Sequence, residues 1–480
     1  MEITGSMAPE PVGGAGIFIR APGRRGTVES VAPAASVTRA ARRDHVRDAV
    51  SAMGDANLAI VGRVDVNIEP ASIQAPPARD GAATRSDAIQ PPAILVDKRD
   101  DATAYAVHYF DEETHADMWV LPTDPNQKQL TFELPETPPR QTGNTRAFVT
   151  AAMRGLVTVV AWVTDPIVGL AANAIASAWE AKRRPYGLYQ VRGDGELVLP
   201  DWSTFDGQPV LLLVHGTFST PKAGFYGWIN NPAFAEIHKR YGGRCLALAH
   251  PTMHTDPTEN VDWLMANLPK GKQWNFDTVS HSRGGLVVRE LAARANEDQS
   301  YRVNRMVMVA PPNFGTPLAN AAHWIVFLNA HTSILTYAPD TVATIVGEGL
   351  LCLVKILGSG VARGLSGIAA MNLEGSYLQK LAPRSYSNPT GLFAAAASYS
   401  PSNPALIKQL IARAGDGAVD GFFGEANDMV VPTKGCSEGL LTSSGFPIPA
   451  ARLLRLDGTA HHCNLFEQKD VHEKLGKWLA

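Results

Sequence analysis

Short apolar runs alternate with helical patterns along the C-terminal part of this chain. Runs of about four to eight mostly apolar residues, bounded by turn residues, are typical of strands buried on both faces of a sheet. Apolar residues spaced three and four apart are typical of amphipathic helices. The predicted strands are Val210–Val214, Cys245–Ala249, Thr278–Ser280, Arg305–Val309, Leu392–Ser398 and Arg452–Leu456, and the predicted helices cover about 258–268, 285–297 and 468–479.

This alternation predicts a domain of the α/β class over residues 201–480, doubly wound around a mostly parallel sheet. Parallel strands need crossover connections, and helices on both faces of the sheet supply them. The stretch from Leu318 to about Pro383 interrupts the alternation with long apolar segments. We therefore expect a helical cap or lid over residues 318–383.

The first 200 residues follow a different pattern. Residues 1–85 are rich in alanine, proline, glycine and scattered arginine, with one helical pattern near 37–53, and they predict a mobile low-complexity segment. Residues 86–200 are interpreted as an accessory region, in which short apolar runs between 91 and 135 indicate strands. We expect this region to precede the α/β domain without sharing its pattern.

Two apolar stretches raise the question of a membrane. Residues 145–182 predict an apolar helical hairpin that turns at Asp165-Pro166, and residues 341–371 are apolar between scattered charges. Neither stretch offers about 18 uninterrupted apolar residues, the length that a spanning helix needs. The sequence therefore predicts buried or cap helices, and contact with the lipid interface remains the alternative.

Composition excludes several classes of protein. Of 480 residues, 45% are hydrophobic and 19% charged, and the net charge of −3 gives no reason to expect nucleic acid as a partner. Four scattered cysteines without a CxxC pair argue against a disulfide framework and a cysteine-rich zinc site. The first residues lack the basic and apolar regions of a secretory signal. We expect a cytoplasmic protein, with peripheral membrane contact as an open alternative.

Ser282 lies where a β-rich run meets a helical pattern, as a nucleophile elbow requires. In such an elbow the serine occupies a strained strand-to-helix turn that pushes its hydroxyl into a cleft. Strand and helix nearly touch there, so small residues are needed two positions before and after the serine. Ser280 and Gly284 meet this need, although glycine is usual at the first position. The pentapeptide alone is weak evidence, because surface turns share its composition.

A serine hydroxyl also needs groups that stabilise the developing oxyanion. His215 and Gly216 follow the first strand of the α/β domain, where glycine lets the backbone curl toward the cleft. We assign the Thr217 N–H as one oxyanion donor, with Phe218 as the less favoured choice, and the Arg283 N–H as the other. We expect His215 to hold the turn by hydrogen bonds and not to act as the base.

A carboxylate and a histidine follow the serine in the order that a Ser–Asp–His triad of this class requires. Asp428 lies in a loop ahead of apolar residues and a proline, whereas Asp416 and Asp420 lie among glycines and are interpreted as turn residues. His462 follows the last predicted strand and precedes the final helix, which favours it as the base. The adjacent His461 remains an alternative.

These motifs together resemble the α/β-hydrolase superfamily, and within it the serine hydrolases of the lipase and esterase kind. The resemblance covers about 205–480 and rests on ordered motifs: Val214-His-Gly-Thr, His250-Pro-Thr-Met-His254, Ser280-His-Ser-Arg-Gly-Gly and Ala310-Pro-Pro-Asn-Phe-Gly-Thr-Pro317. It implies an α/β-hydrolase fold with a helical cap and hydrolysis of an ester. It does not identify the substrate, because one fold serves many reactions.

The sequence thus predicts hydrolysis of carboxylic esters through an acyl-enzyme, with Ser282 as nucleophile, His462 as base and Asp428 as the carboxylate that orients His462 and stabilises its positive charge. The long apolar cap favours a hydrophobic acyl chain, so the expected partner is a small-molecule or lipid ester. Two alternatives remain: cleavage of a thioester or amide, or acyl transfer, on the same fold; and a non-catalytic protein of this fold that binds through its N-terminal region.

No cofactor or metal is expected. His250 and His254 are four residues apart, but Pro251 lies between them and the glutamate of a zinc-binding helix is missing. Cys463 does not lie on a strand-to-helix turn, so we interpret it as a core contact and not as a nucleophile.

Overall fold

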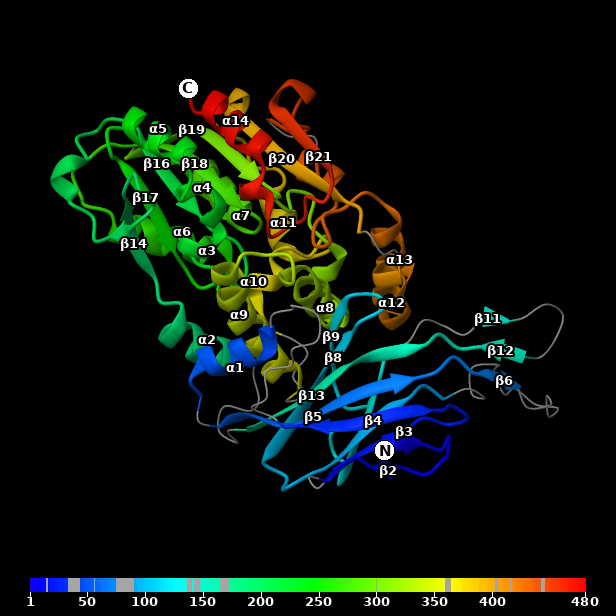
Figure 1. Cartoon of the computed structure of the whole chain (residues 1–480). Helices are drawn as coiled ribbons and strands as arrows, with labels where there is room; N and C mark the ends of the chain where they lie inside the picture. Colours follow the sequence, from blue (N-terminus) through cyan, green and yellow to red (C-terminus); the bar gives the residue numbers. More distant parts are fainter. Residues whose placement is uncertain are drawn as a thin grey trace. The chain divides into compact units, whose positions relative to one another are not determined.

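The computed structural model describes the chain except residues 14–15, 33–43, 56, 75–89, 136–139, 142–146, 165–171, 299, 359–363, 402–404, 415–416 and 442–444. The chain divides into two compact units (Figure 1). Unit 1 contains Met1–Gly169, Leu353–Val361 and Ser402–Gly415, and unit 2 contains Leu170–Cys352, Ala362–Pro401 and Asp416–Ala480.

An eight-stranded mixed sheet forms the centre of unit 2, with the strand order β15-β14-β17-β16-β18-β19-β20-β21. The six strands from β17 to β21 pair in parallel, and β14 and β15 add an antiparallel edge. All six predicted strands are present. The bounds are β14 Gly187–Val191, β15 Leu197–Val198, β16 Val210–Val214, β17 Cys245–Ala249, β18 Trp274–His281, β19 Tyr301–Val309, β20 Leu392–Tyr399 and β21 Leu453–Gly458.

Helices cover both faces of this sheet, as the apolar strands predict (Figure 1). In β16 the side chains of Leu212 and Val214 pack with α6 and α7, while those of Leu211 and Leu213 pack with α4, α5 and α14. The three predicted helices correspond to α6, α7 and α14. The bounds are α3 Pro221–Gly224, α4 Tyr226–Ile229, α5 Pro232–Arg240, α6 Pro257–Asn267, α7 Gly284–Arg294 and α14 Lys469–Trp478.

A helical insertion separates β19 from β20, where the sequence predicted a cap. Its longer helices are α8 (Trp324–Leu335) and α9 (Asp340–Gly358), followed by α10 (Ser366–Ala369) and α11 (Ser376–Leu381). Among the described residues α9 alone is long and apolar enough to cross a membrane, with a mean hydropathy of 1.7. Because 72% of that window is buried inside the protein, α9 has the character of a core helix. A lid function for the insertion stays a prediction.

Unit 1 is built mainly from antiparallel strands, with α1 (His45–Met53) and α12 (Ala405–Ala414). Its sheets have the orders β1-β4-β5-β13-β8-β9, β10-β7-β3-β2 and β11-β12-β6. The bounds are β1 Glu2–Ile3, β2 Glu10–Pro11, β3 Ile17–Arg20, β4 Gly26–Val31, β5 Leu58–Ile68, β6 Ser72–Gln74, β7 Ala93–Asp97, β8 Thr103–Asp111, β9 Ala116–Val120, β10 Gln129–Glu133, β11 Arg140–Gln141, β12 Ala147–Val149 and β13 Met153–Val163.

Two expectations for the N-terminal region are wrong. In the described part of 1–85 the chain forms paired strands with buried side chains, such as Ile19 and Val66, instead of a mobile segment. Composition hid these strands, because the partners that stabilise them are distant in sequence. The boundary near residue 200 also differs, since unit 2 already includes α2 (Ala172–Arg183), β14 and β15.

The prediction of a helical hairpin over 145–182 is wrong for its first helix and right for its second. Its second half is the helix α2, but Met153–Val163 is the strand β13, paired with β5 on one side and β8 on the other. A central strand with both faces buried shows a continuous apolar run, which periodicity alone does not separate from a buried helix. The turn expected at Asp165-Pro166 lies outside the described residues.

The packing of α7 against β16 generates a first prediction. A Cβ atom on Gly284 would lie 2.2 Å from the carbonyl oxygen of Val214, so Gly284→Ala forces helix and strand apart. We expect a loss of about 2 kcal/mol or more of unfolding free energy, measured by chemical denaturation. Gly421→Ala in α13 (Gly417–Gly424) is the matched control, because no atom lies within 4 Å of its added Cβ. Equal stability of the two variants would contradict the prediction.

Candidate active site

Ser282 lies directly after β18 with a φ of 53°, in the left-handed region that side chains other than glycine rarely adopt. Its N–H donates to the carbonyl of Val309 at 2.9 Å, which fixes the turn to the neighbouring strand. A Cβ atom on Gly216 would lie 2.6 Å from the Cβ of Ser282. The strained serine and the close approach of small residues are the features that the sequence predicted for an elbow.

The structure brings the three predicted catalytic side chains together. The Oγ of Ser282 and the Nε2 of His462 are 2.8 Å apart, and the Nδ1 of His462 lies 2.7 Å from the Oδ2 of Asp428. The exposed fractions of the three residues are 3%, 3% and 1%. With Nδ1–H donating to the carboxylate, the unprotonated Nε2 accepts the hydrogen bond of the serine hydroxyl. His462 can therefore accept the serine proton through Nε2, and the three side chains are almost fully buried.

Asp428 is held as a carboxylate by the groups around it. Burial alone would raise its pKa, but the charge and hydrogen bond of His462 and two backbone N–H groups outweigh burial, and the pKa is lowered. The two N–H groups belong to Val430 and Val431, which donate to Oδ1 at 3.0 and 2.7 Å. Both carboxylate oxygens are therefore satisfied, and the side chain is fixed in the orientation that His462 needs.

His461 lies next to the triad but does not join it. Its Nδ1 accepts from the Cys463 N–H at 3.3 Å, and its ring makes a tilted contact with Tyr337 and an edge contact with Tyr399. Burial lowers the pKa of His461 to about 4, so the ring is neutral at pH 7. Of the two adjacent histidines, the structure therefore places His462 against the serine.

The loop after β16 offers the predicted oxyanion donor. The Phe218 N–H, the less favoured choice, already donates to the Oγ1 of Thr252 at 3.1 Å. The N–H groups of Thr217 and Arg283 have no acceptor among the described residues. Arg283 immediately precedes α7, where backbone N–H groups have no partner inside the helix. These two groups are thus available to an oxyanion at Ser282.

A buried glutamate supports this loop, and sequence reasoning missed it. Glu180 of α2 is fully buried and accepts the N–H groups of Thr252, Met253 and His254 at 2.5 to 3.1 Å. It also contacts the Nδ1 of His254 at 2.5 Å. Because Thr252 in turn accepts from Phe218, Glu180 fixes the chain behind the oxyanion loop. An isolated glutamate in a basic helix end gave no signal of this role.

His215 holds the turn, as expected. Its Nδ1 lies 3.0 Å from the carbonyl of Gly216, and its Nε2 accepts from the His250 N–H at 3.3 Å. The two histidine rings stack with centroids 4.3 Å apart. Burial lowers the pKa of His215 to about 4 and the pKa of His250 well below its usual value. Both rings are therefore neutral at pH 7 and support the turn through their contacts.

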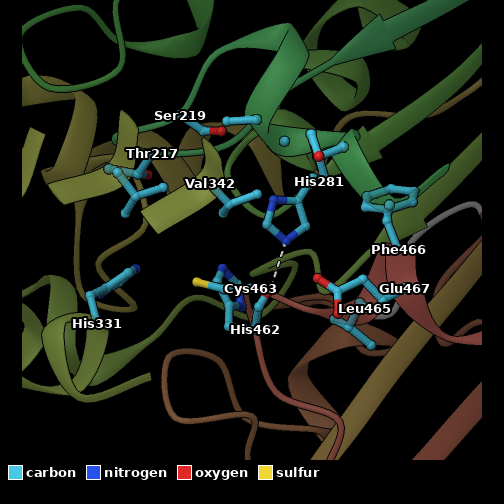
Figure 2. A pocket seen from close by; sticks show the side chains of 15 residues that line it. Thr217, Ser219, His281, His331, Val342, His462, Cys463, Leu465, Phe466 and Glu467 are labelled. Atoms are coloured by element: carbon cyan, nitrogen blue, oxygen red, sulfur yellow. Dashed lines mark hydrogen bonds between the residues drawn. The ribbon is translucent and has the colours of Figure 1, made fainter. Parts of the chain in front are cut away.

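Two more histidines surround the base, and the sequence gave no reason to single them out. The Nε2 of His281 lies 2.9 Å from the backbone carbonyl of His462, and the His331 ring lies 5.9 Å from the His462 ring (Figure 2). Burial is the main cause that lowers the pKa of each to about 3. Both are neutral at pH 7, so they limit the charge around His462.

The pocket beside the triad is narrow and largely apolar. Its volume is about 30 Å³, room for roughly two water molecules. Val342 and Val346 of α9 line it together with Leu465 and Phe466, and Figure 2 shows Val342 near His281. The predicted cap region therefore contributes apolar side chains directly to the site. Cys463 also lines the pocket, and burial raises the pKa of its thiol.

No group of three or more potential metal ligands occurs among the residues that the structure describes. His250 and His254, considered above as a metal pair, have other contacts: His250 stacks on His215, and His254 contacts Glu180.

The chain has a parallel sheet covered by helices on both faces, and a strained serine lies at the carboxyl edge of that sheet. In both features it resembles the α/β-hydrolase superfamily. More particularly, the chain belongs to the family DUF7379, a domain of unknown function, whose model matches residues 185–480. No curated protein matches the chain.

Solved structures of lipases and esterases are similar to this chain. The lipase BlEst2 of Bacillus licheniformis is 14% identical, over 62% of this chain and 98% of its own, with a TM-score of 0.34. EstA of Clostridium botulinum is 12% identical over 57% and 87%, with a TM-score of 0.38, and lipase 1 of Pelosinus fermentans is 13% identical over 57% and 98%, with a TM-score of 0.36.

The lowered pKa of Asp428 generates a second prediction. An aspartate has a pKa of about 3.9 in an unfolded chain, so the folded state favours the ionised form. This stabilises the fold at pH values above that pKa, and the contribution is lost as the pH falls through the lower folded value. We expect the unfolding temperature of Asp428→Asn to fall less steeply than that of the wild type from pH 5 to pH 3. The exposed Asp420→Asn serves as control and should follow the wild type; identical slopes for all three proteins would contradict the prediction.

Proposed function

We propose that the chain is a serine hydrolase of carboxylic esters on an α/β-hydrolase fold. One observation carries the proposal: a strained, buried serine within hydrogen-bond distance of a histidine whose other nitrogen is held by a buried carboxylate. A serine in an ordinary turn needs neither the left-handed backbone nor the two aligned partners. This arrangement has the geometry of nucleophilic acyl transfer.

In the first half of the reaction, the Oγ of Ser282 attacks the ester carbonyl carbon and the Nε2 of His462 takes its proton. The carbonyl oxygen becomes an oxyanion, which accepts hydrogen bonds from the N–H groups of Thr217 and Arg283. Each such donor contributes about 3 kcal/mol in comparable sites. Asp428 stabilises the positive charge on the imidazole. His462 then returns the proton to the leaving alcohol, and the acyl group remains on Ser282.

In the second half, water replaces the alcohol. His462 takes a proton from the water, whose oxygen attacks the acyl carbon, and the second oxyanion uses the same two donors. The acid leaves as Ser282 regains its proton from His462. The neutral His281 and His331 support this cycle, because a charged neighbour would oppose the imidazolium on His462.

An apolar acyl chain fits the surroundings of the serine best. The side chains that α9 contributes to the pocket are aliphatic, and Phe218 packs against Phe327 of α8 with ring centroids 5.8 Å apart. Only about 30 Å³ is open in this state, so an acyl chain longer than a few carbons requires the cap side chains to move apart.

The role of the serine is tested by Ser282→Ala. We expect this variant to lose hydrolysis of short p-nitrophenyl esters by about four orders of magnitude or more, and to lose covalent labelling by a fluorophosphonate. Ser280→Ala is the matched control, because the Ser280 hydroxyl is buried and makes no hydrogen bond among the described residues. Labelling that survives in Ser282→Ala would refute the assignment. An acyl-enzyme that forms but releases product only to an added alcohol would instead support acyl transfer.

The choice of base is tested by comparing His462→Ala with His461→Ala. The first removes the group that accepts the serine proton and should lower kcat by about 10⁴-fold or more. The second removes a ring that contacts neither Ser282 nor Asp428, so we expect kcat to change less than tenfold. Steady-state kinetics with one ester measure both values. The reverse order of effects would show that the base is misassigned.

A further inference from the structure

A second and larger pocket is lined by residues of the oxyanion loop. Its volume is about 180 Å³, against about 30 Å³ for the pocket beside His462. Ser219 lines both pockets, and His215 lines the second one. The segment after β16 therefore contributes residues to both pockets. The mechanism proposed above does not use this second pocket.

The second pocket is basic in a chain whose net charge is −3. Its lining includes Arg183, Arg184 and Lys222 but no aspartate or glutamate. Both arginines pair with one carboxylate, that of Glu348, at 3.0 and 2.8 Å. The formal charges of these four side chains sum to +2, so the pocket favours an anion that carries more than one negative charge.

Uncharged donors add to the cations. The hydroxyl groups of Thr220 and Tyr189 belong to residues that line the same pocket, whereas the Ser219 hydroxyl already donates to the Thr220 carbonyl at 3.3 Å. The Nε of Arg184 is buried without a hydrogen-bond acceptor among the described residues, although 10% of the side chain remains exposed. An unsatisfied buried donor is unfavourable unless a ligand or water completes it. Several donors around a compact space suit an anion with many acceptor oxygens.

We propose that this basic pocket binds a phosphoryl group, as inorganic phosphate or as a phosphate ester. A phosphate monoester carries about −1.5 to −2 charges at pH 7 and three strong acceptor oxygens, which matches the charge and the donors of the pocket. Because Ser219 and His215 belong to the oxyanion loop, the bound group contacts the segment that positions Thr217. The site does not depend on ester hydrolysis, and its test uses binding alone.

Binding of inorganic phosphate to the full chain, followed by isothermal titration calorimetry at constant ionic strength, tests the site. We expect saturable binding that Lys222→Glu and Arg183→Gln each weaken at least tenfold. Lys182→Glu is the matched control for charge, because Lys182 is exposed on the last turn of α2 and does not line the pocket. Ser282→Ala should bind as the wild type does, which separates this site from the proposed reaction.

A monomeric short-chain phosphatidic acid, whose headgroup is a phosphate monoester, is titrated in the same way and separates the two sources of the phosphoryl group. Tighter binding of the lipid than of inorganic phosphate, lost in Lys222→Glu, identifies a lipid headgroup, and the reverse order identifies a soluble phosphate. Either result supports the pocket. Two results overturn the proposal: the absence of saturable binding of both probes, or an equal loss in Lys182→Glu and Lys222→Glu.

Discussion

The close approach of two backbone segments at Ser282 is the constraint on which the site depends. The start of α7 meets the end of β16 so closely that a Cβ atom on Gly284 would lie 2.2 Å from a carbonyl oxygen, and one on Gly216 would lie 2.6 Å from the serine Cβ. The positive φ of Ser282 stores strain that the sheet and the helix together maintain. Without this packing the serine would have no fixed direction, and neither the base nor the oxyanion donors would have a common target.

Neutral histidine rings surround the pair formed by Asp428 and His462. The rings of His215, His281, His331 and His461 have pKa values lowered to between about 3 and 4, mainly by burial. Their neutral rings form hydrogen bonds with backbone groups and so help to hold the surrounding chain in position. In a site nearly closed to water, Coulomb interactions are weakly screened, so a second positive charge would oppose the imidazolium strongly. Neutral supports avoid that repulsion.

Several elements could be predicted because their causes are local. Val210–Val214 and Cys245–Ala249 are continuous apolar runs, and the structure gives these two strands the predicted bounds. The same local logic failed for Met153–Val163, where an apolar run on both faces of a central strand resembles a buried helix. It failed again for residues 1–31, whose strands are stabilised by partners such as β5 and β7, remote in the sequence and not visible in composition.

The sequence by itself determined which residues could be catalytic and their order along the chain. It showed Ser282 between small residues, with Asp428 and His462 after it. It also showed His215 and Gly216 at the end of the first strand of the α/β domain. These depend on residue type and spacing, which a single chain displays. The tertiary structure alone decided which of two adjacent histidines meets the serine, and that Thr252 leaves Thr217 as the available donor. It also placed the neutral histidines and the basic pocket, because proximity between distant segments comes from packing and not from spacing.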